Sequence, residues 1–345
     1  MNEQENMEIT AEKNSEKKDW KKYIFNSHVL FLLIAVAVIL FIIFYVKGWG
    51  VKIDENYINQ HGVYSEGRDC YDNLQPLLDE TGELLANHSP HTILFFGNGA
   101  FAEDRNSENN VVNMIAKRTG STVYNCSVEG SYLAARTSSL KYTLSGLDVY
   151  NFYWLSIFLT WDEDLDYFDW LREQPGATIL PETDYIERTL STIDMNTVDT
   201  IAIMYDASDY LASSPFFNPE NSTDVMSFYG NLAAGLDVLQ AKYPHVRIIV
   251  LSPTYAFAED ENGNYVSSDL KEYNEKMGRE ALSTYMLKEG EAAGERGITF
   301  IDNLYGTFDE DEAPEYLKDN VHLNQKGREL LVQRFIGALT MYDEN

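Results

Sequence analysis

Asp319 and His322 are the two residues whose types and spacing point most directly to chemistry. An imidazole held by a carboxylate on one ring nitrogen can take a proton on the other, as a general base does in acyl transfer. Because the acid precedes the histidine by three residues on a predicted turn, both side chains can point the same way. Such a pair also ties down loops without any catalytic role, so a catalytic interpretation needs support from elsewhere in the chain.

Three other segments combine a predicted buried strand with glycine or polar residues where the strand ends. They are Thr92–Ala100 (TILFFGNGA), Val123–Gly130 (VYNCSVEG) and Thr200–Asp209 (TIAIMYDASD). In open α/β sheets, ligands and catalytic groups lie at the carboxyl ends of the strands. We therefore expect these strand ends to meet the segment that carries His322.

In this order, the four segments resemble the four sequence blocks of the SGNH/GDSL hydrolase family, over roughly residues 92–340. The most specific part is the Asp-x-x-His of residues 319–322 with the Leu-Asn-x-x-Gly that follows it. The resemblance implies a serine-type ester hydrolase or O-acyltransferase. In such a site His322 is the catalytic base, Asp319 orients it, and the backbone N–H of Gly130 stabilises the oxyanion.

The chain departs from the family pattern at two positions of the expected site. Gly99 stands where the family has its nucleophilic serine, and Ser208 stands where the family has an asparagine that is followed by an acid, here Asp209. The resemblance therefore places Gly99, Gly130, Ser208 and Asp209 around the oxyanion. The hydroxyl of Ser208 is still a donor, with a shorter reach than an amide.

Gly99 has no side chain with which to attack a substrate. Loss of the nucleophile of a serine enzyme costs on the order of a millionfold in turnover. Two alternatives remain open: another strand-end serine could act, or His322 and Asp319 could activate water directly. The serines are Ser127, Ser131 and Ser252.

The elements that must position these residues are predicted strands that alternate with helices. This pattern predicts a single three-layer α/β/α domain with a five-stranded, mainly parallel sheet of the SGNH or flavodoxin-like kind. The fourth and fifth strands are expected at 246–251 and 298–301, and residues 257–266 as an acidic surface excursion. Helices are predicted at 109–117, 133–147, 181–193, 224–243, 269–296 and 324–341.

Residues 29–46 carry no charged side chain. As a helix this run is about 27 Å long, close to the hydrocarbon thickness of a bilayer, and it exceeds the apolar region of a signal peptide. Five lysines precede it, which places the amino terminus in the cytoplasm. We predict a cytoplasmic polar tail (1–27), a transmembrane helix (28–48), stalk or cap helices (49–90) and an extracytoplasmic hydrolase-like domain (91–345) at the cell membrane.

The formal net charge of −29 argues against nucleic acid as a partner. We expect no metal or organic cofactor: His88 and His91 are predicted on a turn surface, and 309–312 (DEDE) as a solvated loop. Gly97-Asn-Gly99 formally fits a dinucleotide fingerprint, but the second strand ends without the acid that would bind the ribose. Whether Cys70 and Cys126 form a disulfide stays open, because an exported domain permits one.

Two functions fit these observations. One is a membrane-anchored extracytoplasmic SGNH-like esterase or acyltransferase that acts on acyl groups of cell-surface glycans, with weakened or lost serine chemistry. The other is a non-catalytic relative that binds a polysaccharide or a protein as an accessory to an acylation or export system. The substrate class rests on the family resemblance and the predicted location alone, and no substrate-binding residues are identified.

Overall fold

The computed structural model describes residues 70–79, 81–85, 89–138, 140, 147–161, 166–175 and 179–343. All of them belong to one compact unit, His61–Asn345. No helix among these residues is long and apolar enough to cross a membrane, and the predicted anchor (28–48) lies outside them. The anchor therefore stays a prediction.

Five parallel strands form the central sheet in the order β2-β1-β3-β4-β7. They are β1 (Thr92–Gly97), β2 (Thr122–Asn125), β3 (Thr200–Met204), β4 (Arg247–Leu251) and β7 (Thr299–Ile301). The three central strands, β1, β3 and β4, are runs of apolar residues that are almost entirely buried, as expected for strands covered on both faces. This is the flavodoxin-like strand order, and the predicted five-stranded parallel sheet is confirmed.

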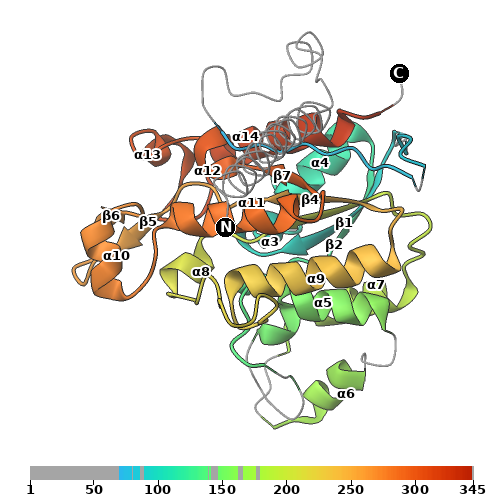
Figure 1. The fold of residues 1–345 in the computed structure, drawn as a ribbon, viewed down its shortest axis with the longest axis horizontal. Coiled ribbons are helices and arrows are strands. Elements are labelled where there is room, and N and C mark those ends of the chain that lie inside the picture. Colours follow the sequence, from blue (N-terminus) through green and yellow to red (C-terminus); the bar gives the residue numbers. More distant parts are fainter. Residues whose placement is uncertain are drawn as a thin grey trace, which may run out of the picture. The chain divides into compact units, whose positions relative to one another are not determined.

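Helices cover both faces of the sheet (Figure 1). α4 and α14 pack together on one face, and α5, α9 and α11 cover the other. The helices are α3 (Gly99–Ala102), α4 (Val111–Thr119), the 3₁₀ helix η1 (Asp148–Tyr150), α5 (Phe152–Thr160), α6 (Asp166–Glu173), α7 (Thr183–Thr192), α8 (Ser208–Leu211), α9 (Phe228–Lys242), α10 (Lys271–Met277), α11 (Leu282–Gly294), α12 (Asn303–Gly306), α13 (Ala313–Tyr316) and α14 (Gln325–Thr340).

Polar caps determine where several of these helices begin. Asn110 accepts a hydrogen bond from the backbone N–H of Asn113 at the start of α4, and Asn324 accepts from Lys326 and Gly327 at the start of α14. An asparagine cap satisfies N–H groups that have no partner within the helix. The cap on Asn324 fixes the entry of α14 two residues after His322.

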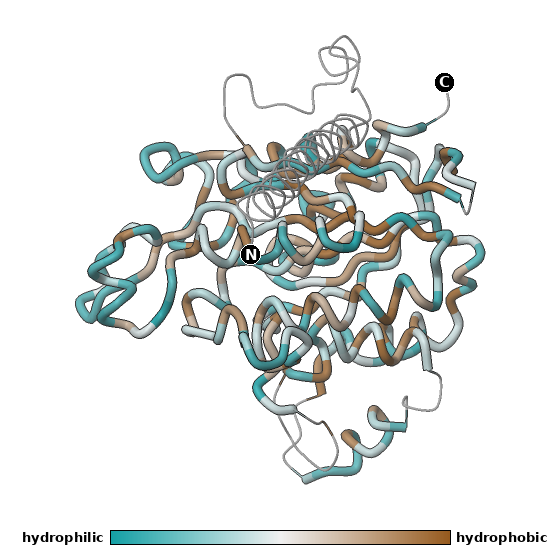
Figure 2. The backbone as a smooth tube through the Cα atoms, viewed as in Figure 1, coloured by the Kyte–Doolittle hydropathy of each residue, from teal (hydrophilic) through white to brown (hydrophobic). Residues whose placement is uncertain are grey.

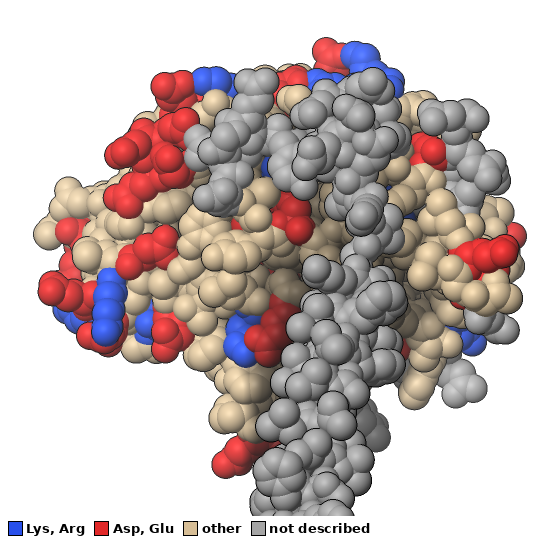
Figure 3. Space-filling view, turned by 45° about the horizontal axis from the view of Figure 1, so that its top comes forward, with Lys and Arg blue, Asp and Glu red and all other residues tan. Residues whose placement is uncertain are grey.

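The hydrophobic residues gather in the sheet and on the inward faces of the helices, whereas the loops are mainly hydrophilic (Figure 2). Acidic side chains form groups on the face that Figure 3 presents, with scattered Lys and Arg among them. The predicted excursion at 257–266 forms a small antiparallel hairpin of β5 (Phe257–Glu259) and β6 (Tyr265–Ser267).

Two helix predictions are wrong in part. Among residues 133–147, those that the structure describes contain no α-helix. The N–H groups of Leu133 and Ala134 bond the carboxylate of Asp209, and those of Arg136 and Thr137 bond Asp148. These tertiary acceptors replace the helical ones. The predicted helix 269–296 divides into α10 and α11, because Gly278 ends α10 in a left-handed conformation.

The predicted stalk or cap helices at 49–90 are not helical where the structure describes them, at 70–79, 81–85 and 89–90. Asn73 instead forms an antiparallel bridge with Phe300 of β7, at the edge of the sheet. Asp72 accepts two hydrogen bonds from the guanidinium of Arg334 on α14, at 2.8 and 3.0 Å, and both side chains are 3% exposed. A buried ion pair thus holds this segment against the domain.

We expect Asp72→Ala to lower the free energy of unfolding by about 3–5 kcal/mol, because it leaves the guanidinium of Arg334 buried without its carboxylate. Urea denaturation of the full chain measures the change. Replacing both partners, Asp72→Leu with Arg334→Met, removes both charges and should cost less. The interpretation is wrong if Asp72→Ala costs no more than the double replacement.

Glu289 of α11 is a buried acid without a hydrogen-bond partner among the residues that the structure describes. Its side chain is 0% exposed, and neither carboxylate oxygen has a partner. Burial, together with the nearby charges of Asp209 and Asp302, raises the pKa of Glu289 well above its usual value. The folded protein therefore keeps the proton over a pH range in which the unfolded chain releases it.

Because of this difference, the free energy of unfolding decreases as the pH rises above the pKa that Glu289 has in the unfolded chain. The decrease is up to about 1.4 kcal/mol per pH unit. We expect Glu289→Gln to remove that slope between pH 5 and 8, measured as the free energy of unfolding against pH relative to wild type. The control is Glu291→Gln, two residues along the same helix, where the acid is 45% exposed and pairs with Lys288. Parallel curves for wild type and Glu289→Gln would contradict the interpretation.

Candidate functional site

His322 and Asp319 form the pair that their spacing predicts. The Nδ1 atom of His322 lies 2.8 Å from Oδ2 of Asp319, and Oδ1 of Asp319 accepts the backbone N–H groups of Val321 and His322. Burial tends to raise the pKa of Asp319, but these hydrogen bonds outweigh it and lower that pKa. The charged carboxylate fixes the tautomer of the ring, so that Nε2 is the nitrogen that faces the site.

Asn98, directly after β1, joins three of the four segments. Its Oδ1 accepts the backbone N–H of Asp206 at 2.7 Å, and its Nδ2 donates to Oδ1 of Asp206 at 3.0 Å and to the carbonyl of Ser131 at 2.7 Å. Its side chain is 1% exposed. One buried amide thus connects the ends of β1 and β3 with the loop that follows β2, an arrangement that the sequence analysis missed.

Gly99 lies directly against the side chain of Asp206. A Cβ atom built on Gly99 would lie 2.2 Å from Oδ2 of Asp206, and Gly99 has a φ of +24°, a conformation that L residues rarely adopt. The carboxylate therefore occupies the space in which any side chain at position 99 would begin. The sequence analysis did not select Asp206, although an acid two residues after the buried end of β3 was a visible signal.

Three hydrogen bonds hold one oxygen of the Asp206 carboxylate. Its Oδ1 accepts from Asn98, from the backbone N–H of Ser208 at 2.9 Å and from the hydroxyl of Ser208 at 2.5 Å. Ser208, predicted as an oxyanion donor, therefore donates its hydroxyl to Asp206 in this arrangement. Burial raises the pKa of Asp206, against the lowering influence of these donors and of His322.

Asp209 and Gly130 differ in their exposure and in their contacts. Asp209 is 1% exposed and accepts the N–H groups of Leu133 and Ala134, and burial raises its pKa to about 6. It positions the loop rather than facing the site. Gly130 is exposed, and the side chain of its neighbour Glu129 contacts His322. The structure thus brings the predicted oxyanion loop next to the imidazole.

The three alternative serines are fully buried at 0% exposure. Ser131 donates to the carbonyl of Val128, and Ser252 accepts the N–H of Asn303 at the start of α12. The hydroxyl of Ser127 is buried without a hydrogen-bond partner in the described part of the chain. Since the positions are solvent-inaccessible, none of the three serines is placed as a nucleophile.

Glutamates surround Nε2 of His322. Oε1 of Glu129 lies 3.5 Å from Nε2, and Oε1 of Glu103, the residue that ends α3, lies 3.8 Å from it. The interaction with Glu129 is the largest influence on the imidazole, and with the contributions of Asp319 and Glu103 it raises the pKa of His322 to about 9, against the effect of burial. At neutral pH both ring nitrogens of His322 therefore carry a proton, and the ring cannot accept another.

Other predicted features lie away from this cluster. His91 is buried, not on a turn surface, with Nδ1 and Nε2 at 3.2 and 3.1 Å from carboxylate oxygens of Asp199 and Asp343. His88 lies outside the described residues. Cys70 and Cys126 are both free. Gly97 of the formal dinucleotide fingerprint serves strand packing, because a Cβ there would lie 1.9 Å from the carbonyl oxygen of Met204.

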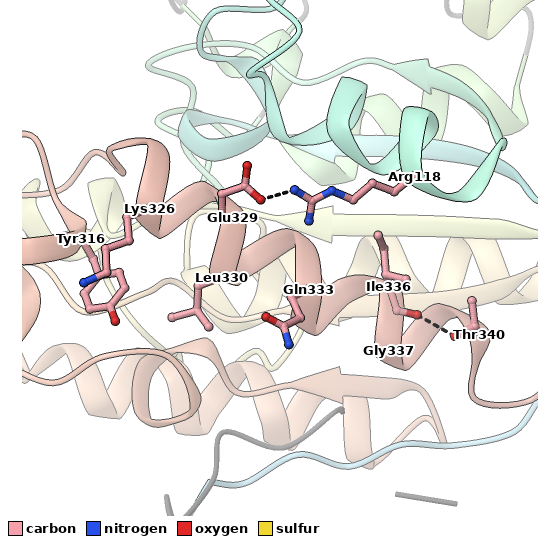
Figure 4. A pocket seen from close by; sticks show the side chains of 9 residues that line it. All are labelled: Arg118, Tyr316, Lys326, Glu329, Leu330, Gln333, Ile336, Gly337 and Thr340. Carbon is pink, nitrogen blue, oxygen red and sulfur yellow. Dashed lines mark hydrogen bonds and ion pairs between the residues drawn. The ribbon is translucent and has the colours of Figure 1, made fainter. Parts of the chain in front are cut away.

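A pocket of about 450 Å³ lies along α14, between that helix and Arg118 (Figure 4). Glu329 faces Arg118 across it, and the ammonium group of Lys326 lies over the ring of Tyr316, 4.4 Å from its centroid. None of the predicted site residues lines this pocket. It is therefore a surface hollow separate from the His322 cluster.

Comparisons with known proteins show distant structural likeness. A Lactobacillus plantarum protein has 14% identity and a TM-score of 0.48, with 74% of this chain and 98% of that chain covered. A candidate SGNH hydrolase from Slackia heliotrinireducens has 15% identity and a TM-score of 0.39, covering 74% and 100%. A carbohydrate acetylesterase from Sinorhizobium meliloti has 12% identity and a TM-score of 0.36, covering 72% and 98%. No family model and no curated protein matches the chain.

The contact between Gly99 and Asp206 predicts a specific energetic coupling. Gly99→Ser should destabilise the protein by about 1–3 kcal/mol, because the new side chain meets Oδ2 of Asp206 and the backbone conformation disfavours it. In an Asp206→Ala background the cost should fall, giving a favourable coupling of about 1 kcal/mol or more in a double-mutant cycle. Urea denaturation of the four proteins measures it.

The matched control is Asp206→Asn, which keeps the volume of the side chain and removes its charge. Gly99→Ser should remain costly in that background. A coupling that is as large with asparagine as with alanine would mean that charge, not space, links the two positions. If Gly99→Ser shows no coupling with Asp206→Ala or with Asp206→Asn, the contact between the two positions would be contradicted.

Proposed function

We propose that this chain is a membrane-anchored, extracytoplasmic SGNH/GDSL hydrolase-like protein that recognises acyl groups of cell-surface glycans and has lost serine-esterase chemistry. The single observation that carries the loss is the carboxylate of Asp206 in the space beside Gly99. The glycan class rests on the resemblance of the four sequence blocks, and the membrane anchor on the apolar run 29–46.

The electrostatics of the site support this proposal. Hydrolysis or acyl transfer through a serine forms a negatively charged oxygen, which the N–H of Gly130 would have to stabilise. The carboxylate of Glu129 is on the adjacent residue, and Asp206 adds a further charge near His322. A nearby negative charge opposes a developing negative oxygen, although the 52% exposure of Glu129 lets solvent screen part of this repulsion. The site therefore disfavours the intermediate that the family's chemistry requires.

Direct activation of water by His322 is a poorer explanation of the site. A general base must be unprotonated at the working pH, whereas Glu129, Asp319 and Glu103 hold the pKa of His322 at about 9. Below that pH most molecules carry an imidazolium, which is able to donate a proton but not to accept one.

A second candidate function is that of a non-catalytic accessory subunit, which binds a polysaccharide or a protein of an acylation system on the same scaffold. The hydrogen bonds of Ser208 favour it, because the hydroxyl in place of the family's asparagine bonds Asp206. The departures at Gly99 and Ser208 thus converge on one carboxylate, while the strands that form the scaffold remain regular. This pattern is typical of a site released from catalytic demands.

We expect that wild type and Gly99→Ser will both fail to react with a serine-directed fluorophosphonate, and that Gly99→Ser/Asp206→Gly will react. The double variant supplies a hydroxyl together with the space for it, and His322 is already oriented. Labelling should be followed by mass spectrometry over pH 7–10, because more of the imidazole is unprotonated near pH 9.

Adding His322→Ala to the double variant is the control, and it should abolish the labelling without removing the new serine. Labelling of wild type would mean that a native serine acts as nucleophile, and the proposed loss of serine chemistry would be wrong. An inert double variant that folds as wild type does would show that the site lacks more than a nucleophile and its space.

A further inference from the structure

Three side chains from separate strand-end segments converge around one point next to His322. Glu103 follows α3, Glu129 lies in the loop after β2, and His322 precedes α14. Nε2 of the imidazole and one oxygen of each glutamate all lie within 4.8 Å of one another. We propose that these three residues form a binding site for one divalent transition-metal ion, which goes beyond the proposed function and does not depend on it.

The two distances from the imidazole to the glutamates are close to those between the ligand atoms of a bound ion. Nε2 lies 3.5 Å from Oε1 of Glu129 and 3.8 Å from Oε1 of Glu103. Imidazole nitrogen and carboxylate oxygen bind Zn²⁺ at about 2.0–2.2 Å, so that ligand atoms of a tetrahedral site lie about 3.3–3.5 Å apart. The two distances to Nε2 need a contraction of only a few tenths of an ångström. The oxygens of Glu103 and Glu129 lie within 4.8 Å of each other, and the exposed side chain of Glu129 can close the remaining gap. The fourth position is left for water.

The orientation of the imidazole is that of a metal ligand. Asp319 binds Nδ1 and leaves the lone pair of the neutral ring's Nε2 directed toward the glutamates. Metal-bound histidines commonly donate their other ring N–H to a carboxylate in this way. In a serine hydrolase Nε2 would bond the nucleophile's hydroxyl, but Gly99 offers none. Asp319 is thus a positioning residue for the proposed ligand.

The ligands differ in how firmly they are held. The side chain of Glu103 is 10% exposed, and its Oε2 bonds Arg328 at 2.9 Å. That of Glu129 is 52% exposed. A buried, anchored ligand opposite an exposed one gives a site that an ion can enter from solvent. The ammonium group of Lys318 lies 2.7 Å from Oε1 of Glu103 and must move away, and its 45% exposure permits this.

The excess of negative charge around the site also favours the binding of a cation. Glu103, Glu129, Asp319 and Asp206 place four carboxylates around the imidazole. Lys318 and Arg328 are the cations that contact Glu103, and Arg328 also pairs with Asp104 at 2.7 Å. A divalent ion offsets part of the remaining negative charge. A mixed imidazole and carboxylate set suits Zn²⁺ and its neighbours, whereas Ca²⁺ and Mg²⁺ prefer oxygen ligands only.

The test is zinc binding by the full chain in detergent, after removal of metal with a chelator, followed by isothermal titration. We expect one Zn²⁺ per chain. Glu129→Gln and Asp319→Asn should each weaken binding by about 10- to 100-fold, and His322→Gln by at least as much. Lys318→Met should tighten binding, because it removes the competitor for Oε1 of Glu103.

Glu315→Gln is the matched control, since it removes an exposed carboxylate of the same region that pairs with Lys326 and lies outside the cluster. It should leave the affinity unchanged. Co²⁺ in place of Zn²⁺ provides a second readout, namely the visible absorption of a tetrahedral site, which should be absent in His322→Gln.

Three results would overturn the proposal. They are no stoichiometric binding by wild type, equal affinity in wild type and in folded Glu129→Gln and His322→Gln, or displacement of Zn²⁺ by equimolar Ca²⁺ or Mg²⁺. Thermal unfolding without added metal establishes that each variant is folded. If substitution of His322 disturbs the fold, Glu129→Gln still tests the site, because the side chain of Glu129 is half exposed and its replacement should leave the fold intact.

Discussion

The ends of β1 and β3 meet through the contact between Gly99 and Asp206, and the arrangement of the site depends on it. The space beyond Gly99 accommodates one side chain, and the carboxylate of Asp206 lies there. Asn98 bonds both the backbone and the side chain of Asp206, while Ser208 bonds the same carboxylate oxygen. These hydrogen bonds hold the carboxylate in place, so a serine at position 99 has to displace it.

The acidic side chains around His322 determine the electrostatic character of the site. An esterase needs an unprotonated base and donors that stabilise a negative oxygen. Here Glu103 and Glu129 lie next to the imidazole of His322, so a positive charge is favoured where the family's chemistry would need a neutral nitrogen. The same geometry that opposes ester cleavage supports the binding of a cation.

The fold was largely predictable from the sequence, because its signals are local. The apolar runs of β1, β3 and β4 each end in glycine or polar residues, and their alternation with helices specifies a parallel sheet. The described part of the helix expected at 133–147 is not helical, because Asp148 and Asp209, from other elements, bind its backbone N–H groups. No pattern within the segment indicates acceptors that come from elsewhere in the chain.

The candidate site was predictable in its position but not in its contents. His322 and Asp319 are close in sequence, so their spacing indicates their contact. Asp206 and Gly99 are far apart in the chain, and only the folded structure shows that one side chain fills the space that the other position leaves. The same holds for Glu103 and Glu129, which the strand-end loops bring to the imidazole from different segments.

The most direct measurement of the central claim is a crystal structure of the Gly99→Ser variant. The account predicts that the carboxylate of Asp206 is driven from its place, with loss of its hydrogen bonds to Asn98 and Ser208. A serine side chain that is well ordered at position 99, with Asp206 unmoved and both hydrogen bonds intact, would contradict it.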